Sequence, residues 1–271
     1  MDNKKRVVFM YDFDKTLATK YSTEFTFNKM LGVSDKDFWH YCNNVVTKEY
    51  NMESNIAFLF TCLMMAKERK IKLTQELFSK LGKDIEFFPG VDKWFTNINK
   101  YGKKLGLQVE HYIISSGISE IIEGTNIAKY FNKIFASSYV YDQNGEAFWP
   151  RNIVNYTTKT QYIYRIKKNS IDEIWEDSIV NKKIRNKDEV IPFENMIYIG
   201  DGFTDVPSMQ IVQDNGGNSI CVYAEGEQHI ADNLLNDERV NHVAKADYRM
   251  GSELTKITKH ILDNIAKNSI K

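Results

Sequence analysis

The sequence predicts an α/β fold with a doubly wound, mostly parallel sheet and a small helical cap domain inserted after the first strand. Two observations lead to this expectation. Apolar runs of strand length alternate with amphipathic segments of helical period over most of the 271 residues, an order that covers both faces of a parallel sheet with helices. Several amphipathic segments also follow one another directly after the first apolar run. We therefore expect a core over residues 1–17 and 86–271 and a cap over residues 18–85.

The first predicted strand is the apolar run Val7–Tyr11, and it ends at two acidic residues. Asp12 and Asp14 are two positions apart in the chain. In an extended chain such side chains project to the same side, about 7 Å apart. This pair can therefore address a single reaction centre.

A second apolar run, Met196–Ile199, also ends at acidic residues, which are Asp201 and Asp205 in a glycine-containing turn. If the two strands are parallel neighbours, all these carboxylates reach the edge where open sheets of this type bind their ligands. Crowded carboxylates repel one another and take up protons unless a divalent cation lies among them. Hard oxygen ligands suit Mg²⁺, which also binds phosphate groups. The sequence therefore predicts a phosphate and a metal at this edge.

Three amphipathic segments make up the predicted cap. Ser34, Asn55 and Thr74 each precede apolar residues at helical spacing, and each can cap a helix. The apolar positions are Phe38, Trp39, Cys42 and Val45 in the first segment, Leu59, Leu63 and Ala66 in the second, and Leu77, Phe78 and Leu81 in the third. A Phe-Phe-Pro-Gly turn signal at 87–90 follows the insertion.

The remaining elements alternate between the two periods. Helices are expected over 91–105, 118–123, 158–168, from about 206, over 228–235 and over 253–266, and strands over 109–114, 134–139, 196–199 and 219–223. The Asn144-Gly145 pair predicts a tight hairpin that projects from the sheet. The charged stretch 169–194 shows no readable periodicity.

Composition excludes several classes of protein. Lys plus Arg number 36 and Asp plus Glu number 36, so no broad field favours a nucleic acid or an anionic membrane. The apolar stretch after the basic N-terminus is too short for a signal peptide or a membrane span, so we expect a cytoplasmic protein. The three cysteines and five histidines show no ligand-like spacing, which predicts buried thiols and either surface or hydrogen-bonded core histidines. The oligomeric state is left open.

These motifs resemble those of the haloacid dehalogenase-like (HAD) phosphatase superfamily, and four of them occur along the core in the expected order. The resemblance implies a Rossmann-like core in which Asp12 attacks phosphorus to form an aspartyl phosphate. Asp14 would donate a proton to the leaving oxygen and then take one from the hydrolytic water. Two carboxylates in unlike surroundings can divide these roles, because the nucleophile must be ionised and the acid must hold a proton.

Two further motifs would bind the phosphate. Ser115, Ser116 and Gly117 follow a predicted strand, and the Ser115 hydroxyl and the backbone N–H groups after it could cradle a phosphate oxygen. A lysine is also expected to balance the charge of the phosphate and the nucleophile. Lys159, at the start of a predicted helix, is better placed for this than Lys182 or Lys183.

The last motif would complete a magnesium site. The resemblance makes Asp201 a direct Mg²⁺ ligand and Asp205 a neighbour that orients the ligand shell. Asp12 would add a carboxylate oxygen and Asp14 its backbone carbonyl. Each motif also has a structural interpretation when taken alone: the first acidic pair as a turn or helix cap, Ser115 as a helix cap, and Lys159 as a solvated residue.

A helical cap directly after the nucleophile resembles the phosphoserine phosphatase branch, which closes over small phosphorylated metabolites. That branch holds an amino acid with a cap glutamate and a cap arginine. Here Glu24 is not at the usual spacing, and Arg69 stands at the end of its helix. The cap is instead rich in aromatic residues, which are cap core by default and of which a few could line an apolar specificity pocket. These are Phe25, Phe27, Phe38, Trp39, Tyr41, Phe58 and Phe60.

Three functions are compatible with the motifs. A magnesium-dependent phosphatase acting on a small phosphorylated metabolite fits best. A phosphotransferase to an acceptor other than water uses the same residues, and product analysis would distinguish it. A catalytically silent protein that binds a phosphorylated ligand has no need of a proton shuttle, so Asp14 argues against it. A dehalogenase needs neither Asp14 as an acid nor a magnesium cluster.

Overall fold

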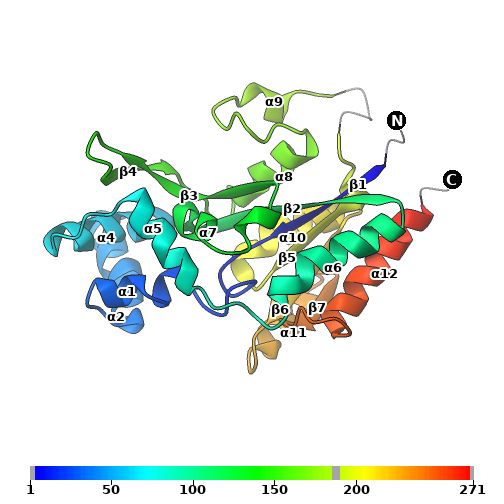
Figure 1. Ribbon diagram of the computed structural model, residues 1–271, viewed down its shortest axis with the longest axis horizontal. Coiled ribbons are helices and arrows are strands. Elements are labelled where there is room, and N and C mark those ends of the chain that lie inside the picture. The colour runs from blue at the N-terminus through cyan, green and yellow to red at the C-terminus, as the bar shows by residue number, and fades with distance from the viewer. Residues whose placement is uncertain (1–3, 185–189, 269–271) are drawn as a thin grey trace.

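The computed structural model describes residues 4–184 and 190–268, which form a seven-stranded sheet with helices on both faces (Figure 1). The strand order is β4-β3-β2-β1-β5-β6-β7, and all neighbouring strands are parallel except the antiparallel pair β3 and β4. The strands are β1 (Lys5–Tyr11), β2 (Leu107–Ile118), β3 (Lys133–Tyr141), β4 (Ala147–Asn152), β5 (Met196–Gly200), β6 (Asn218–Tyr223) and β7 (His242–Lys245). The predicted fold class is confirmed.

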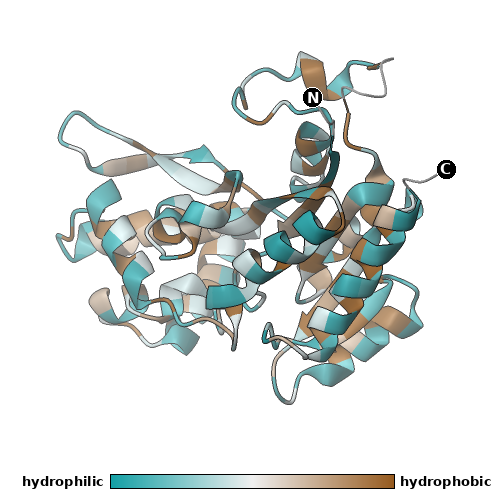
Figure 2. Cartoon of the chain, turned by 45° about the vertical axis from the view of Figure 1, so that its right-hand side comes forward, coloured by the Kyte–Doolittle hydropathy of each residue, from teal (hydrophilic) through white to brown (hydrophobic). Residues whose placement is uncertain are grey.

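Helices cover the sheet in two layers because alternate strand residues point to opposite faces. In β1, Phe9 and Tyr11 enter one hydrophobic cluster, while Val8 and Met10 enter the other. The first face is covered by α6 (Val91–Lys104), α7 (Ser119–Glu123) and α12 (Glu253–Lys267), and the second by α8 (Lys159–Lys167), α10 (Val206–Asp214) and α11 (Gln228–Asn236). Figure 2 shows hydrophobic and hydrophilic residues alternating along these helices, as expected for elements with one buried side.

The insertion between β1 and α6 is helical after its first residues, and its helices gather beside β3 and β4 (Figure 1). They are η1 (Ser22–Glu24), α1 (Phe27–Met30), α2 (Asp35–His40), η2 (Tyr41–Val46), α3 (Thr47–Tyr50), α4 (Ser54–Glu68), α5 (Gln75–Leu81) and η3 (Gly82–Asp84). The chain enters and leaves this insertion through two paired segments. The amide of Thr19 donates to the carbonyl of Glu86, and the amide of Phe88 donates to that of Leu17, both at 2.9 Å.

The insertion packs closely on the core. Phe78 of α5 stacks on Tyr139 of β3 with ring centroids 5.6 Å apart, and both belong to one continuous hydrophobic cluster. Gly82 and Gly124 let the backbones of the two parts approach. A Cβ atom on Gly124 would lie 2.0 Å from the carbonyl oxygen of Ser79, so a larger residue there would separate α5 from α7.

Two expectations about the insertion are wrong in detail. The helix capped by Ser34 is confirmed, with the Ser34 side chain accepting from the amide of Asp37, but it buries Val46 instead of Val45. The reason is that η2 is a π-helical stretch, whose wider turn shifts the buried position by one residue. The cap of α4 is Glu53 instead of Asn55. Its carboxylate accepts from two backbone amides of the first turn, which suits the positive end of the helix dipole.

Three features of the core also differ from the expectations. Strand β2 continues through the Ser-Ser-Gly motif to Ile118, with a register shift after Ser115. Strand β7 was not predicted, because it is only four residues long and half-buried. The unreadable stretch contains α9 (Ser178–Asn181) and the 3₁₀ turn η6 (Phe193–Asn195), while its residues 185–189 lie outside the described part of the chain.

Thr74 caps α5 through the amide of Leu77, as the sequence predicts. Short 3₁₀ turns complete the fold at η4 (Ala128–Tyr130) and η7 (Phe203–Asp205). Among residues 4–184 and 190–268, no helix combines the length and apolar character that a membrane span requires.

Candidate active site

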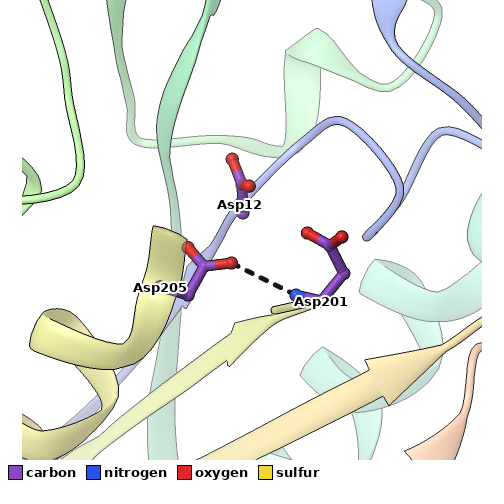
Figure 3. Close-up of side chains that lie close together, drawn as sticks. All are labelled: Asp12, Asp201 and Asp205. Atoms are coloured by element: carbon purple, nitrogen blue, oxygen red, sulfur yellow. Dashed lines mark hydrogen bonds between the residues drawn. The ribbon is translucent and has the colours of Figure 1, made fainter. Parts of the chain in front are cut away.

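Three aspartates converge at the carboxyl ends of two neighbouring strands (Figure 3). Asp12 follows β1, Asp201 follows β5 and Asp205 begins the next helix, and one carboxylate oxygen of each lies within 4.8 Å of the others. The two strands are parallel and hydrogen-bonded, and the amide of Asp12 continues their ladder by donating to Ile199 at 2.9 Å. The strand ends therefore meet at one edge, as the sequence predicted.

Asp205 is completely buried and its carboxylate is fixed by three donors. One oxygen accepts from Lys159 Nζ and from the Tyr198 hydroxyl, both at 2.7 Å. The other oxygen accepts from the amide of Asp201 at 3.2 Å, the bond drawn in Figure 3. Gly200 makes room for this carboxylate, because a Cβ atom at position 200 would lie 2.4 Å from its Cγ.

Lys159 is the buried cation of the site. Its ammonium lies 3.1 Å from Asp12 and 2.7 Å from Asp205, and its side chain is fully shielded from solvent. The residues before it fix the start of α8. Asn155 Oδ1 accepts from the amide of Thr158, and Thr158 Oγ1 accepts from the amide of Asn155, a reciprocal arrangement like a capping box. The interpretation of Lys159 as a solvated helix residue is therefore wrong.

Burial and neighbouring charges shift the pKa values of several groups in the cluster. Burial raises the pKa of Asp12 to about 6, with Lys159 opposing the shift and Asp205 adding to it. Burial and the charges of Asp205 and Asp12 raise the pKa of Asp201 well above its usual range. For Lys159, burial disfavours the charged form, but the attraction of Asp12 and Asp205 outweighs it and holds the pKa high.

Asp14 lies apart from this cluster, in a different environment. Its carboxylate accepts from the amide of Ser22 at 2.8 Å and from the Ser22 hydroxyl at 3.4 Å, so the first turn of the insertion holds it. Burial, and then the charge of Asp12, raise its pKa to about 7. Asp14 can therefore hold a proton near neutral pH while Asp12 is ionised.

The Ser-Ser-Gly motif lies next to Asp14. A Cβ atom on Gly117 would be 3.2 Å from an Asp14 carboxylate oxygen, so this backbone passes close to the acid. Ser115 is buried and its hydroxyl oxygen accepts from the amide of Gly117 at 3.1 Å, which leaves the hydroxyl hydrogen to donate elsewhere. Ser116 and Gly117 line a cavity that also reaches Asp14.

The donor set fits a divalent cation. The carboxylates of Asp12 and Asp205 contact one buried ammonium, and a carboxylate oxygen of Asp201 lies within 4.8 Å of an oxygen of each. Three convergent carboxylates, two of which (Asp12 and Asp201) have raised pKa values, are the arrangement that a hard, oxygen-preferring cation stabilises. Because Asp205 is occupied by Lys159 and Tyr198, Asp12 and Asp201 are the side chains best able to turn an oxygen toward an ion.

The cavity beside Asp14 has a volume of about 450 Å³ and runs between the core and the insertion. Its walls from the insertion include Tyr21, Trp39 and Phe58. The ring centroids of Trp39 lie 4.8 Å from Tyr21 and 5.5 Å from Phe58. The indole N–H of Trp39 donates to Glu24 at 2.7 Å, which fixes the orientation of the ring.

Sequence reasoning missed several contacts of the site. Tyr198 holds Asp205, Ser22 holds Asp14, and the Thr16 hydroxyl donates to Asp201 at 3.4 Å. Thr16 and Tyr198 stand next to the acidic motifs in the chain, but the contact of Thr16 follows only from the packing of β1 against β5, and that of Tyr198 only from the way the chain turns between β5 and α10. Lys182 and Lys183 are exposed near α9, and Arg69 binds the carbonyl of its own helix at Met65. None of these three lines the cavity.

Comparison with known proteins places the chain among phosphatases. A family model described as Putative Phosphatase matches residues 7–223. An uncharacterized protein of Borreliella burgdorferi is 30% identical over 281 residues, covering 94% of this chain and 96% of the relative. A HAD family hydrolase of Salmonella enterica serovar Typhi superposes with a TM-score of 0.56 at 17% identity, covering 91% of this chain and 70% of the other. A phosphoserine phosphatase with a phospho-aspartyl intermediate analogue superposes with a TM-score of 0.55 at 16% identity, covering 95% of this chain and 99% of the other.

Proposed function

Because the chain belongs to the Putative Phosphatase family, we propose that this HAD-like phosphatase is magnesium-dependent and hydrolyses a small phosphorylated metabolite through an aspartyl-phosphate intermediate. One observation carries the proposal: Asp12, Asp201 and Asp205 converge beside the buried ammonium of Lys159. A carboxylate that contacts both a cation site and a lysine is well placed to approach a phosphate dianion without prohibitive repulsion.

Asp12 is the proposed nucleophile. A carboxylate oxygen of Asp12 forms a bond to phosphorus while the bond from phosphorus to the substrate oxygen breaks. Two contacts orient this carboxylate: the amide of Phe13 donates to one oxygen at 2.7 Å, and Lys159 lies 3.1 Å from the other. Lys159 and the Ser115–Gly117 backbone would stabilise the negative charge of the phosphoryl group during its transfer to Asp12.

Asp14 is the proposed acid and base. Its pKa of about 7 lets it hold a proton in the free protein and give that proton to the departing alkoxide. In the second step it accepts a proton from the water that hydrolyses the aspartyl phosphate. Its bonds to Ser22 tie the proton donor to the insertion, so closure of the insertion over a substrate would also set the position of Asp14.

Asp12 and Asp201 would hold Mg²⁺, together with the backbone carbonyl of Asp14, and Asp205 would orient this set through the amide of Asp201. A bound Mg²⁺ neutralises charge on the carboxylates and on the phosphate. The phosphate itself would lie against Ser115, Ser116, Gly117 and Lys159. All these assignments rest on the geometry of the side chains and on the family.

The insertion would act as a cap domain over residues 18–85. Its paired entry and exit segments, at Leu17–Thr19 and Glu86–Phe88, form a narrow two-stranded connection to the core. The cavity between the two parts is lined by aromatic rings, amides and hydroxyls, and no Lys, Arg or His occurs among the described residues that line it. The part of the substrate beyond the phosphate is therefore expected to be uncharged or cationic, and a carboxylate there would lack a partner.

Phosphate release from p-nitrophenyl phosphate, with Mg²⁺ or with EDTA, tests the proposal. We expect hydrolysis with Mg²⁺ and its loss in EDTA, restored when Mg²⁺ is added back. A second assay compares ethyl phosphates that carry a hydroxyl, an ammonium or a carboxylate group, and the carboxylate should give the lowest kcat/KM. Full activity in EDTA would refute the metal requirement. Product analysis with an added alcohol would reveal transfer to an acceptor other than water.

A further inference from the structure

A second cavity, of about 600 Å³, lies at the β3 side of the sheet. It is lined by residues of α7, β3, β4, α8 and the segment 171–177 that leads to α9. None of the four site aspartates lines it. Its volume falls in the range of small-molecule sites, so it is large enough to hold a ligand independent of the phosphatase centre.

One wall of this second cavity is held in place by a buried arginine. The Arg165 side chain is only 1% exposed, and it donates to the backbone carbonyls of Glu173, Ile174 and Glu176 and to the carboxylate of Asp177, at 2.7 to 3.2 Å. Burying a guanidinium is unfavourable unless its donors are satisfied, and here a single loop provides the acceptors for both terminal nitrogens. The loop therefore has a defined shape before any ligand binds.

Trp175 stands in this fixed loop, yet its side chain is 76% exposed. An indole held by a rigid backbone loses little conformational freedom when a partner packs against it, and for this reason tryptophan is common where proteins bind ligands. The lining also includes the stacked rings of Phe135 and Tyr162, with centroids 4.7 Å apart, but each of these residues is only 2% exposed. Among the described lining residues, Trp175 is therefore the aromatic side chain that a flat apolar group can pack against.

The charged groups of the lining are mostly positive. Lys133, Arg151 and Arg165 stand against a single acid, Glu123. Arg165 is engaged by the loop, and Lys133 pairs with Asp172 at 3.1 Å. Arg151 uses its Nε to donate to Ser138 at 3.1 Å, and its charge acts on the buried carboxylate of Glu120. Within residues 4–184 and 190–268 its two terminal nitrogens have no hydrogen-bond partner. A planar guanidinium with free terminal donors is suited to bind an anionic oxygen group.

We propose that the second cavity binds a small aromatic molecule that carries a negative charge, with its ring against Trp175 and its anionic group at Arg151. Helix α8 connects this site to the phosphatase centre. Lys159 begins the helix, and Gln161, Tyr162 and Arg165 of the same helix line the cavity. The second part of the proposal, which rests on the proposed function, is that the ligand acts as an effector of the phosphatase centre through this helix.

Binding of naphthalene-1-sulfonate to the full chain in EDTA, followed by calorimetry, tests the first part. This probe has the required ring and charge and carries no phosphate. We expect saturable binding, weakened about tenfold by Trp175→Ala or by Arg151→Gln, because each removes one of the two recognition elements. Trp149→Ala is the matched control, since Trp149 is 67% exposed but does not line the cavity. Its affinity should equal that of the wild type.

The site is refuted if the probe does not bind, or if both cavity variants bind as tightly as the Trp149 control. Equal affinity for uncharged 1-naphthalenemethanol would refute recognition of the charge. The second part is tested by p-nitrophenyl phosphate hydrolysis with saturating probe, where we expect a change in kcat that Trp175→Ala abolishes. Binding without any change in kcat or KM would refute the effector role alone. If the wild-type protein hydrolyses no p-nitrophenyl phosphate even in the absence of the probe, the proposed function itself is refuted.

Discussion

The cavity beside Asp14 and the second cavity both have aromatic residues in their lining, but the charged groups of the two linings have opposite sign. In the cavity beside Asp14, Trp39 is fixed by Glu24 and by neighbouring rings, and Asp14 is the charged residue among the described residues of the lining. In the second cavity Trp175 is left in solvent and the charged lining is mainly cationic. The comparison teaches that aromatic walls alone do not distinguish the two sites. The sign of the surrounding charge does, and under the proposed function the acidic site would need Lys159 and a metal before it could accept a phosphate.

Asp12→Asn should have the largest effect, and on one site only. An amide cannot attack phosphorus, so kcat for p-nitrophenyl phosphate should fall by about 10⁴-fold or more. Binding of naphthalene-1-sulfonate should be unchanged, because Asp12 does not line the second cavity. Asp237→Asn, at an exposed position, is the matched control and should retain full activity. Undiminished turnover in the Asp12 variant would remove the proposed nucleophile.

Lys159→Met should have the next largest effect. The variant keeps the length of the side chain but removes the cation between Asp12 and Asp205. We expect kcat to fall by about 10²- to 10³-fold, the range found when a preorganised charge-stabilising group is lost. Saturation kinetics with Mg²⁺ measure this effect, and Lys182→Met serves as control. Equal kcat in both variants would contradict the role of Lys159.

Trp39→Leu should act mainly on KM. Trp39 lines the cavity where the organic part of the substrate would lie, whereas Trp149 is remote from it. With the substrate preferred in the ethyl phosphate series, we expect KM to rise about tenfold and kcat to change little. The Trp149→Leu variant should behave as the wild type. A fall in kcat at unchanged KM would show that the ring positions the acid instead of the substrate.

The smallest expected effect is on stability and depends on pH. A carboxyl group whose pKa is raised in the folded state binds its proton more tightly there than in the unfolded chain. The folded, metal-free protein therefore loses stability as the pH rises through about 6, the pKa of Asp12. Deprotonation of Asp201, whose pKa is also raised, lowers the free energy of unfolding in the same way. Asp201→Asn should raise the Tm at about pH 8 by about 2 to 6 °C relative to the wild type, and by less at about pH 5.

Thermal unfolding followed by circular dichroism measures this difference. Added Mg²⁺ should raise the Tm of the wild type at about pH 8 and raise that of the Asp201 variant much less, because the variant lacks a proposed ligand. Identical Tm values for the two proteins at both pH values would show that the buried carboxylates do not repel one another.

The sequence predicted those features that depend on local pattern. Apolar runs that end at acidic residues identified β1 and β5, and the order of motifs singled out Lys159 among many lysines. What it could not predict depends on contacts between distant residues or on irregular backbone. Tyr198 donates to Asp205 only because both turn to the α8 face, and Val46 is buried only because η2 widens its turn. The second cavity is formed in part by segment 171–177, which has no periodicity to interpret.

Gly200 has a consequence for how variation in this protein should be interpreted. Any side chain at position 200 would occupy the space of the Asp205 carboxylate and push it away from Lys159 and Tyr198. An alanine there would leave all four acidic residues in the sequence and still dismantle the charge arrangement they make. In a natural variant or a saturation library, a substitution of Gly200 would have the effect of an active-site mutation. A motif search that checks only the aspartates would overlook such a substitution.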